Sequence, residues 1–189
     1  MNNSNKDYGI AIFFFTVTLL FIIVAMTNNL VFEWVFDRHH NQWSWYIRPI
    51  FLIPFCVFAY SRSWSGMAIT LFCLFTSMFW FPKPEVVSDQ VHAFLQFEKA
   101  YLKGEWDIKK ALITMAIPVS LFLLGHSFWK RSLIMGFSIL ILMTTGKIVW
   151  SIQNAGESGT SILIPAIIGL IFSCSVLLYG LRKKSKKKR

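Results

Sequence analysis

The residues best suited to chemistry lie in one polar segment, EWVFDRHHNQWSWYIRP, at positions 33–49. If a helix continues through this segment, Glu33, Asp37 and His40 fall on one face, at i, i+4 and i+7. Two carboxylates and an imidazole can bind a divalent metal such as zinc, and His92 is the candidate for a fourth ligand from elsewhere in the chain. These four residues are the metal-ligand candidates of the sequence.

A solvated loop is the simpler interpretation of the same segment. His39 and His40 are adjacent, and adjacent residues do not share a helix face. Arg38 and Arg48 are available to form salt bridges with the acids of the segment. The sequence therefore predicts no metal site and no cofactor, and it keeps the four residues above as weak candidates only.

A second chemical feature is an acid placed on the apolar side of a helix. The segment SDQVHAFLQFEKAYLK at 88–103 begins with Ser88, a suitable N-cap, and Gly104 after it suits a helix end. Glu98 falls at the centre of the apolar stripe, so its carboxylate must be paired, protonated or in contact with a ligand. The stripe comprises Val87, Val91, Phe94, Leu95, Tyr101 and Leu102, and the opposite face carries His92, Gln96, Lys99 and Lys103.

Lys147, in TTGKIVWS, is the corresponding anomaly among the basic residues. It lies about one turn inside Trp150, where an ammonium group needs a carboxylate partner or must lose its proton. Glu98 and Glu157 are the candidate partners, and Arg48 is an alternative partner for Glu98. The competing interpretation of Lys147 is a lysine that snorkels to the membrane rim. Glu98, Lys147 and Arg48 are thus the candidate functional charges.

The elements that must position these residues are membrane helices. Of the 189 residues, 55% are hydrophobic and only 15% are charged, and the mean hydropathy is +0.53. A soluble domain of this length needs more polar residues to cover its surface. We therefore predict an all-α integral membrane protein, with a single polytopic domain over 1–181 and a basic tail over 182–189.

Six apolar stretches approach the ~20 residues that cross a bilayer. The second is the weakest, because Arg48, Pro49 and Pro54 interrupt it, and a re-entrant segment at 47–60 would leave five spans. The helix at 88–103 is predicted to lie on the membrane surface at the non-cytoplasmic side. All eight tryptophans lie at or beside span ends, as an interfacial aromatic belt requires. The predicted spans are roughly 9–28, 42–60, 65–81, 111–129, 132–150 and 160–181.

The tail RKKSKKKR predicts the orientation, because basic residues are retained on the cytoplasmic side. With six spans, the N-terminus is then cytoplasmic too, in a plasma membrane or a bacterial inner membrane. The tail can also attract anionic lipid head groups, at about 1 kcal/mol per basic residue. Nucleic acid is not a predicted partner, because the other basic residues do not form one face.

Function is predicted only at the level of class. The span centres hold no ionisable residue, which argues against a proton-coupled pump, and the three cysteines lie in apolar runs as inert thiols. The pattern favours a non-catalytic accessory or assembly component, whose partners are the lipid bilayer and other membrane subunits. The alternative is a small transporter or channel with 88–103 as an outer lid. An interfacial lipid-modifying or metal-dependent enzyme is least favoured, since no catalytic motif is present and catalytic residues stay unassigned.

Overall fold

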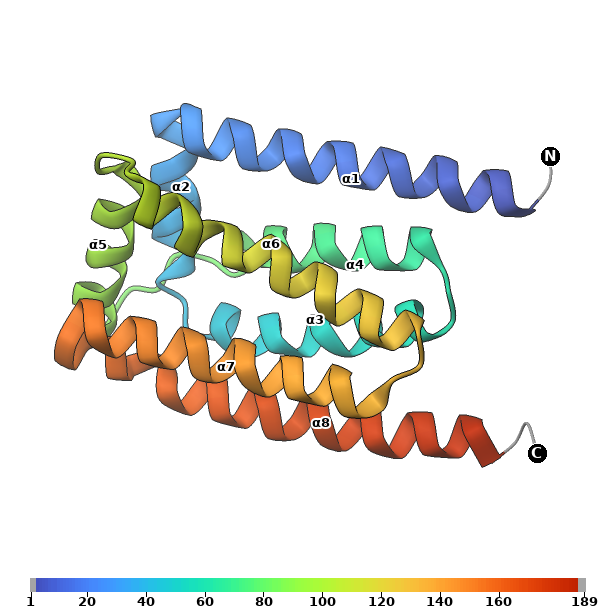
Figure 1. Cartoon of the computed structure of the whole chain (residues 1–189). Helices are drawn as coiled ribbons and strands as arrows, with labels where there is room; N and C mark the ends of the chain where they lie inside the picture. The colour runs from blue at the N-terminus through green and yellow to red at the C-terminus, as the bar shows by residue number, and fades with distance from the viewer. Residues whose placement is uncertain (1–2, 187–189) are drawn as a thin grey trace.

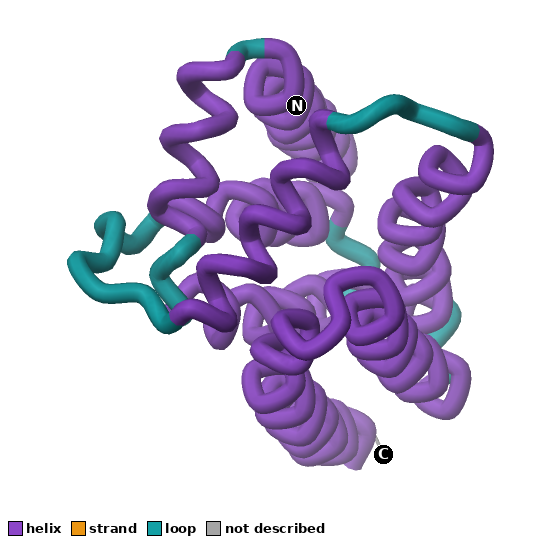
Figure 2. The backbone as a smooth tube through the Cα atoms, turned by 90° about the vertical axis from the view of Figure 1, so that its left-hand side faces the viewer, coloured by secondary structure: helices purple, strands orange, loops and turns teal. Residues whose placement is uncertain are grey.

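The computed structural model describes residues 3–186, and the side chains of residues 4–181 within them. In that range the chain is helical and has no strand, as predicted for an all-α protein (Figures 1 and 2). The elements are α1 (Asn3–Thr27), α2 (Asn29–His39), α3 (Trp43–Tyr60), α4 (Trp64–Thr76), η1 (Ser77–Phe79), α5 (Asp89–Lys103), α6 (Ile108–Trp129), α7 (Leu133–Ala155), η2 (Gly156–Ile162) and α8 (Leu163–Lys186).

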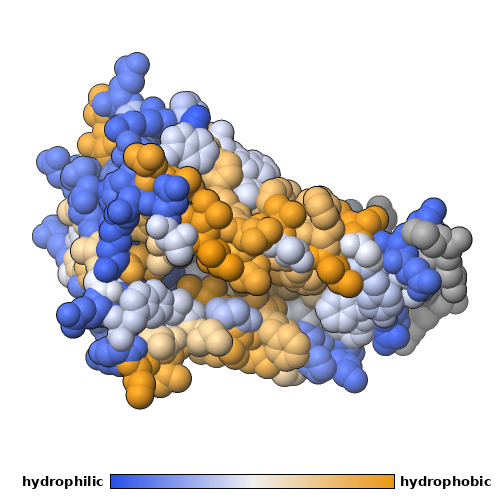
Figure 3. Space-filling model, turned by 90° about the horizontal axis from the view of Figure 1, so that it is seen from above, coloured by the Kyte–Doolittle hydropathy of each residue, from blue (hydrophilic) through white to orange (hydrophobic). Residues whose placement is uncertain are grey.

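Three helical stretches of the described chain are long and apolar enough to cross a membrane. They are Ser4–Thr27, Ile108–Trp129 and Leu133–Leu181, and the last contains α7, η2 and most of α8. On the face seen in Figure 3, hydrophobic side chains cover the sides of the long helices and hydrophilic side chains gather at both ends. The protein is therefore an all-helical membrane protein with three candidate membrane-spanning stretches.

The long helices α1, α3, α4, α6, α7 and α8 run alongside one another, and both termini lie at the same end (Figure 1). Helix α3 lies at the centre, in contact with α4, α6 and α8, although Pro49 and Pro54 lie within it. It is one continuous helix from Trp43 to Tyr60, and Cys56 and Ala59 on it are fully buried. Neighbouring helices thus stabilise a segment whose prolines remove two backbone donors.

A small cap closes the end opposite the termini. Helices α2 and α5 cross this end, and α5 also contacts η2 (Figure 1). The loop PKPE, residues 82–85, separates η1 from α5, because each proline biases its predecessor away from helix. The cap has its own apolar core, made of Phe32, Phe36, Trp45, Val91, Phe94, Leu95 and Ile162.

The terminal end is built from two turns of the same geometry. Arg62 links α3 to α4 and Arg131 links α6 to α7, and both have φ = 59°. In each turn the serine that follows donates its backbone N–H to a carbonyl five residues earlier, at 3.0 Å for Ser63 and 2.9 Å for Ser132. This bond closes a Schellman-type helix end. Two cap–helix–turn–helix units, α2–α4 and α5–α7, therefore follow one another in the same direction.

Asp7 joins α1 to the start of α4. Its carboxylate accepts backbone N–H bonds from Trp64 at 3.0 Å and Ser65 at 3.1 Å, and it also accepts the hydroxyl groups of Ser63 and Ser65. A carboxylate here satisfies N–H groups that have no partner within α4, and it interacts favourably with the positive end of the helix dipole. Asp7 thus has a structural role at the terminal end.

Candidate functional site: a charged cluster beneath α5

Helix α5 forms at the residues predicted from its capping pattern. Its N-cap is Ser88, whose hydroxyl accepts the N–H of Val91, and it ends at Gly104. Val91, Phe94 and Leu95 are buried on the predicted apolar stripe, while the opposite face is exposed at His92, Gln96 and Lys103. Lys99 departs from the pattern, because only 15% of its side chain is exposed and its ammonium pairs with Glu33 on α2.

Glu98 meets its counter-charge on α7. The ammonium of Lys147 lies 2.5 Å from the Glu98 carboxylate, and the side chain of Glu98 is only 18% exposed. The same ammonium lies over the rings of Phe94 and Trp150, at 5.4 and 4.7 Å from their centroids. The aromatic faces and the carboxylate together compensate for the partial loss of water around Lys147. Glu157, the other candidate partner, is not paired with Lys147 in the described structure.

Arg48, near the cap end of α3, is the third charge of the cluster. Its side chain is half-buried, and its positive charge acts on both Glu98 and His39. Within the described side chains, Arg48 has no hydrogen bond or ion pair of its own. Glu98 therefore pairs with one cation, Lys147, and lies within electrostatic range of a second, Arg48, in a site partly shielded from water.

His39 borders this cluster and was not among the residues selected from sequence. Its Nδ1 lies 2.8 Å from the hydroxyl of Ser44, and that hydroxyl donates its only hydrogen to the carbonyl of Asn41 at 2.8 Å. We therefore assign the donating hydrogen of the first bond to Nδ1 of His39. Burial, followed by the nearby positive charges of Arg48 and Lys147, holds the pKa of His39 well below its usual value, so the imidazole stays neutral.

The signal for His39 was present in the sequence. Phe32, Val35, Phe36 and His39 are the buried residues of α2, and their spacing of three, four and seven is that of one helix face. His40 is also buried, but its Nδ1 is bonded to the carbonyl of Phe36 at 2.8 Å. The apolar periodicity of this segment thus indicates His39 as the histidine that turns inward.

The candidate metal ligands are separated by lysines instead of converging. Glu33 pairs with Lys99 and Lys103, and Asp37 pairs with Lys83 at 2.9 Å. These partners are lysines, in place of the arginines expected from the sequence. The lysines hold the pKa of Glu33 below its usual value. Only two of the four candidates, His40 and His92, lie together, with ring centroids 5.4 Å apart.

No group of three or more metal-ligating side chains occurs in the described part of the chain. The cluster beneath α5 brings together two cations, Lys147 and Arg48, and one carboxylate, Glu98. No family model, no curated protein and no solved structure matches this chain.

Proposed function

We propose that the protein crosses a plasma membrane or bacterial inner membrane six times, with both termini cytoplasmic and α5 as an interfacial helix on the other side. Two observations support this: the termini lie at the same end of the bundle, and Arg62 and Arg131 lie in the turns at that end (Figure 1). The basic tail adds seven positive charges there in sequence. Cytoplasmic retention of basic residues then gives the orientation.

We further propose that the protein is a small transporter or channel for an anionic solute, with its outer entrance beneath α5. The observation that carries the proposal is the unequal charge of the cluster, in which Glu98 alone faces Lys147 and Arg48. A purely structural ion pair needs no second cation, and a half-buried guanidinium without a carboxylate of its own is costly. An incoming anion would supply the missing negative charge.

The relative strengths of two contacts indicate how such an entrance works. A partly exposed ion pair such as Glu98–Lys147 contributes only about 0–1 kcal/mol. By contrast, Val91, Phe94 and Leu95 are almost completely buried, and burial contributes ~1.5–3 kcal/mol for a large apolar side chain. Helix α5 is therefore held mainly by its apolar stripe. The moving part is the Glu98 side chain, which exchanges places with the anion while α5 stays docked.

Anion flux into proteoliposomes tests this function, with chloride, nitrate and acetate as the probes. Lys147→Met and Arg48→Gln are expected to abolish flux while the protein still inserts normally. Glu98→Gln is expected to retain anion binding but lose flux, because nothing then displaces the bound anion. Lys83→Gln is the matched control, since it breaks a cap ion pair outside the cluster. No flux of any probe through the unmodified protein, or normal flux in Lys147→Met, would contradict the proposal.

A non-catalytic accessory or assembly component is the second candidate. Its support is the way the cap is tied together, because the pairs formed by Glu33 and Asp37 join α2 to α5 and to the loop before it. A cap fastened in this way offers a fixed docking surface. This candidate predicts that the protein co-purifies with a larger membrane partner, and that the isolated chain carries no flux.

A further inference from the structure

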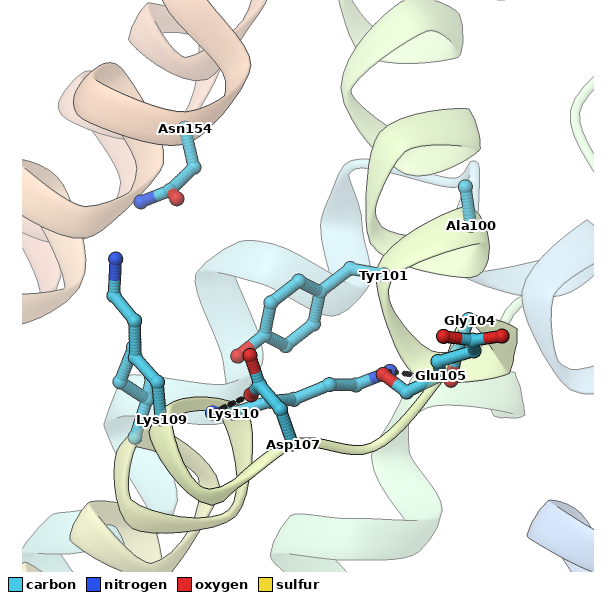
Figure 4. Close-up of a pocket in the computed structure, with 9 residues that line it drawn as sticks. Ala100, Tyr101, Gly104, Glu105, Asp107, Lys109, Lys110 and Asn154 are labelled. Atoms are coloured by element: carbon cyan, nitrogen blue, oxygen red, sulfur yellow. Dashed lines mark hydrogen bonds between the residues drawn. The ribbon is translucent and has the colours of Figure 1, made fainter.

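A pocket of about 310 Å³ opens on the rim of the cap end, and none of the three charges of the cluster lines it. It lies between the C-terminal end of α5, the loop 104–107 and the adjoining ends of α6 and α7 (Figure 4). Its volume is at the lower end of the ~300–1,000 Å³ that ligand pockets occupy. Such a pocket accommodates a small polar group.

Lys110 and Asp107, which line the pocket, form hydrogen bonds within the protein. The ammonium of Lys110 donates to the carbonyl of Gly104 at 2.8 Å and lies over the rings of Tyr101 and Trp106, at 5.1 and 4.7 Å. The carboxylate of Asp107 accepts the N–H of Lys110 at 2.7 Å and caps α6. Both groups therefore have hydrogen-bond partners in the backbone, and they hold the loop in place.

Other polar groups around the pocket have no partner of this kind. In the described structure the ammonium of Lys109 and the carboxylate of Glu105 form no ion pair, and the hydroxyl of Tyr101 is buried without a hydrogen bond. The side-chain amide of Asn154 donates one hydrogen to the carbonyl of Trp150 at 2.7 Å, which leaves a second hydrogen. Three hydrogen-bond donors, from Lys109, Tyr101 and Asn154, and the carboxylate of Glu105 thus remain available to a ligand.

The two charged groups without an ion pair in the described structure, Lys109 and Glu105, lie on different sides of the pocket. Lys109 extends toward Asn154 on one side, Glu105 lies on the other, and the ring of Tyr101 reaches between them from α5 (Figure 4). Lysine, amide and phenol donors match the oxygens of a phosphate group, and a carboxylate matches a primary ammonium. A ligand that carries both a phosphate and an ammonium group matches these two sets of groups.

The surroundings of the pocket identify the ligand as a lipid. Ile113 lines the pocket, and Leu112 on α6 and Val149 on α7 are exposed apolar residues close to it in sequence. Trp106, half-exposed at the same end of α6, is a residue typical of the membrane–water interface. Acyl chains can lie along the apolar helix faces while the head group enters the pocket.

We propose that this pocket binds the phosphoethanolamine head group of a membrane phospholipid. Lys109, Asn154 and Tyr101 bind the phosphate, and Glu105 binds the ammonium group. The site shares no residue with the Glu98–Lys147–Arg48 cluster, so it stands or falls independently of the proposed transport function.

Lipid binding to the purified full chain in detergent, followed by native mass spectrometry, tests the proposal. The probes are phosphatidylethanolamine, phosphatidylglycerol with the same acyl chains, and soluble phosphoethanolamine as a competitor. Lys109→Gln is expected to weaken binding of phosphatidylethanolamine about tenfold, because a charge-assisted hydrogen bond is lost. Glu105→Gln is expected to remove the preference for phosphatidylethanolamine over phosphatidylglycerol.

Two matched variants serve as controls. Lys6→Gln removes an exposed lysine at the opposite end of the bundle, and Glu85→Gln removes an exposed acid in the loop before α5. Equal binding of the two lipids by the unmodified protein, or an equal effect of Lys109→Gln and Lys6→Gln, would overturn the proposal. Competition by soluble phosphoethanolamine at the same concentration as the lipid would also overturn it, since the ligand would then be a free solute.

Discussion

At the scale of single residues, the imidazole of His39 makes the stability of the fold depend on pH. Its low pKa in the folded protein arises from burial and from the charges of Arg48 and Lys147. The unfolded chain, with a histidine pKa of about 6.5, binds a proton at pH values where the folded protein does not. Because the unfolded state then holds more protons, the free energy of unfolding falls as the pH drops below about 6.5.

We expect His39→Asn to reduce this acid sensitivity. The side-chain amide keeps an N–H near the position of Nδ1 for Ser44, but it does not titrate. As the pH falls from 6.5 to 5, the free energy of unfolding of the unmodified protein should decrease by up to about 1.4 kcal/mol per pH unit. The variant should not show this decrease. Thermal unfolding in detergent at both pH values measures the difference. His126→Asn, at an exposed position, is the control, and equal pH dependence in all three proteins would refute the prediction.

Trp45 fits the sequence pattern of an interfacial tryptophan, but it is buried in the structure. The sequence places it in the interfacial belt, but it is only 8% exposed, and its indole N–H donates to the carbonyl of His39 at 3.0 Å. Its ring also contacts Phe94 edge-on, with centroids 5.8 Å apart. Trp45 therefore belongs to the core of the cap, whereas Trp43, at 69% exposure, fits the belt.

At the scale of elements, one close contact in the bundle is between α3 and α8. A Cβ atom added at Gly169 would lie 2.5 Å from Cβ of Pro49, and the hydroxyl of Ser173 donates to the carbonyl of Pro49 at 3.1 Å. Small residues allow such close approach of membrane helices. The hydroxyl bond adds an interhelical contact at the segment of α3 that proline disturbs.

We expect Gly169→Ala to destabilise the protein by about 1–3 kcal/mol, because α3 and α8 must move apart to admit the methyl group. Gly180→Ala on the same helix is the matched control. No atom lies within 4 Å of a Cβ added there, so this variant should gain about 0.5–1 kcal/mol from helix propensity. Melting temperatures in detergent compare the two. A Gly169→Ala protein as stable as Gly180→Ala would show that the contact is not tight.

The repeated units α2–α4 and α5–α7 are also visible in the sequence, at a fixed offset. Pro49 and Pro118, Arg62 and Arg131, and Ser63 and Ser132 are each separated by 69 positions. The two turns also touch, since Trp64 and Trp129 have ring centroids 4.7 Å apart. A repeat of this kind keeps the direction of its helices, as parallel repeats in membrane proteins do.

At the scale of the whole molecule, the number of spans decides where the two termini lie. Six spans place Ser4 and Ser185 on one side of the membrane, whereas five spans place them on opposite sides. The cap at the other end contains the loop around Glu85. The two span counts therefore predict different exposure of one of the two termini. The native cysteines lie in apolar segments, and Cys56 is buried.

We expect Glu85→Cys to react with a membrane-impermeant maleimide in intact cells, and Ser4→Cys and Ser185→Cys to react only after the membrane is opened. The physical reason is that the impermeant reagent reaches only thiols on the outer side. The unmodified protein measures any background from its three cysteines. Labelling of one terminus but not of the other in intact cells would favour five spans and contradict the proposed topology.

Features with a local cause were predictable from sequence. Helix α5 was predicted at 88–103 and is found at Asp89–Lys103, because a serine cap, an apolar period and a terminal glycine act within a few residues of one another. For the apolar stretches, most of the predicted ends likewise lie within a few residues of the helix ends, since length and hydropathy are properties of a single segment. These features predicted the all-helical membrane class before any contact was known.

The charge partners required the tertiary structure. The sequence determined that Glu98 needs a counter-charge, but it left Lys147 and Arg48 equally available. Only the placement of α7 beside α5 brings together Lys147 and Glu98, two residues 49 positions apart, while Arg48 stays close and unpaired. Periodicity fixes which face of a helix a residue occupies, and it carries no information about which other helix that face meets.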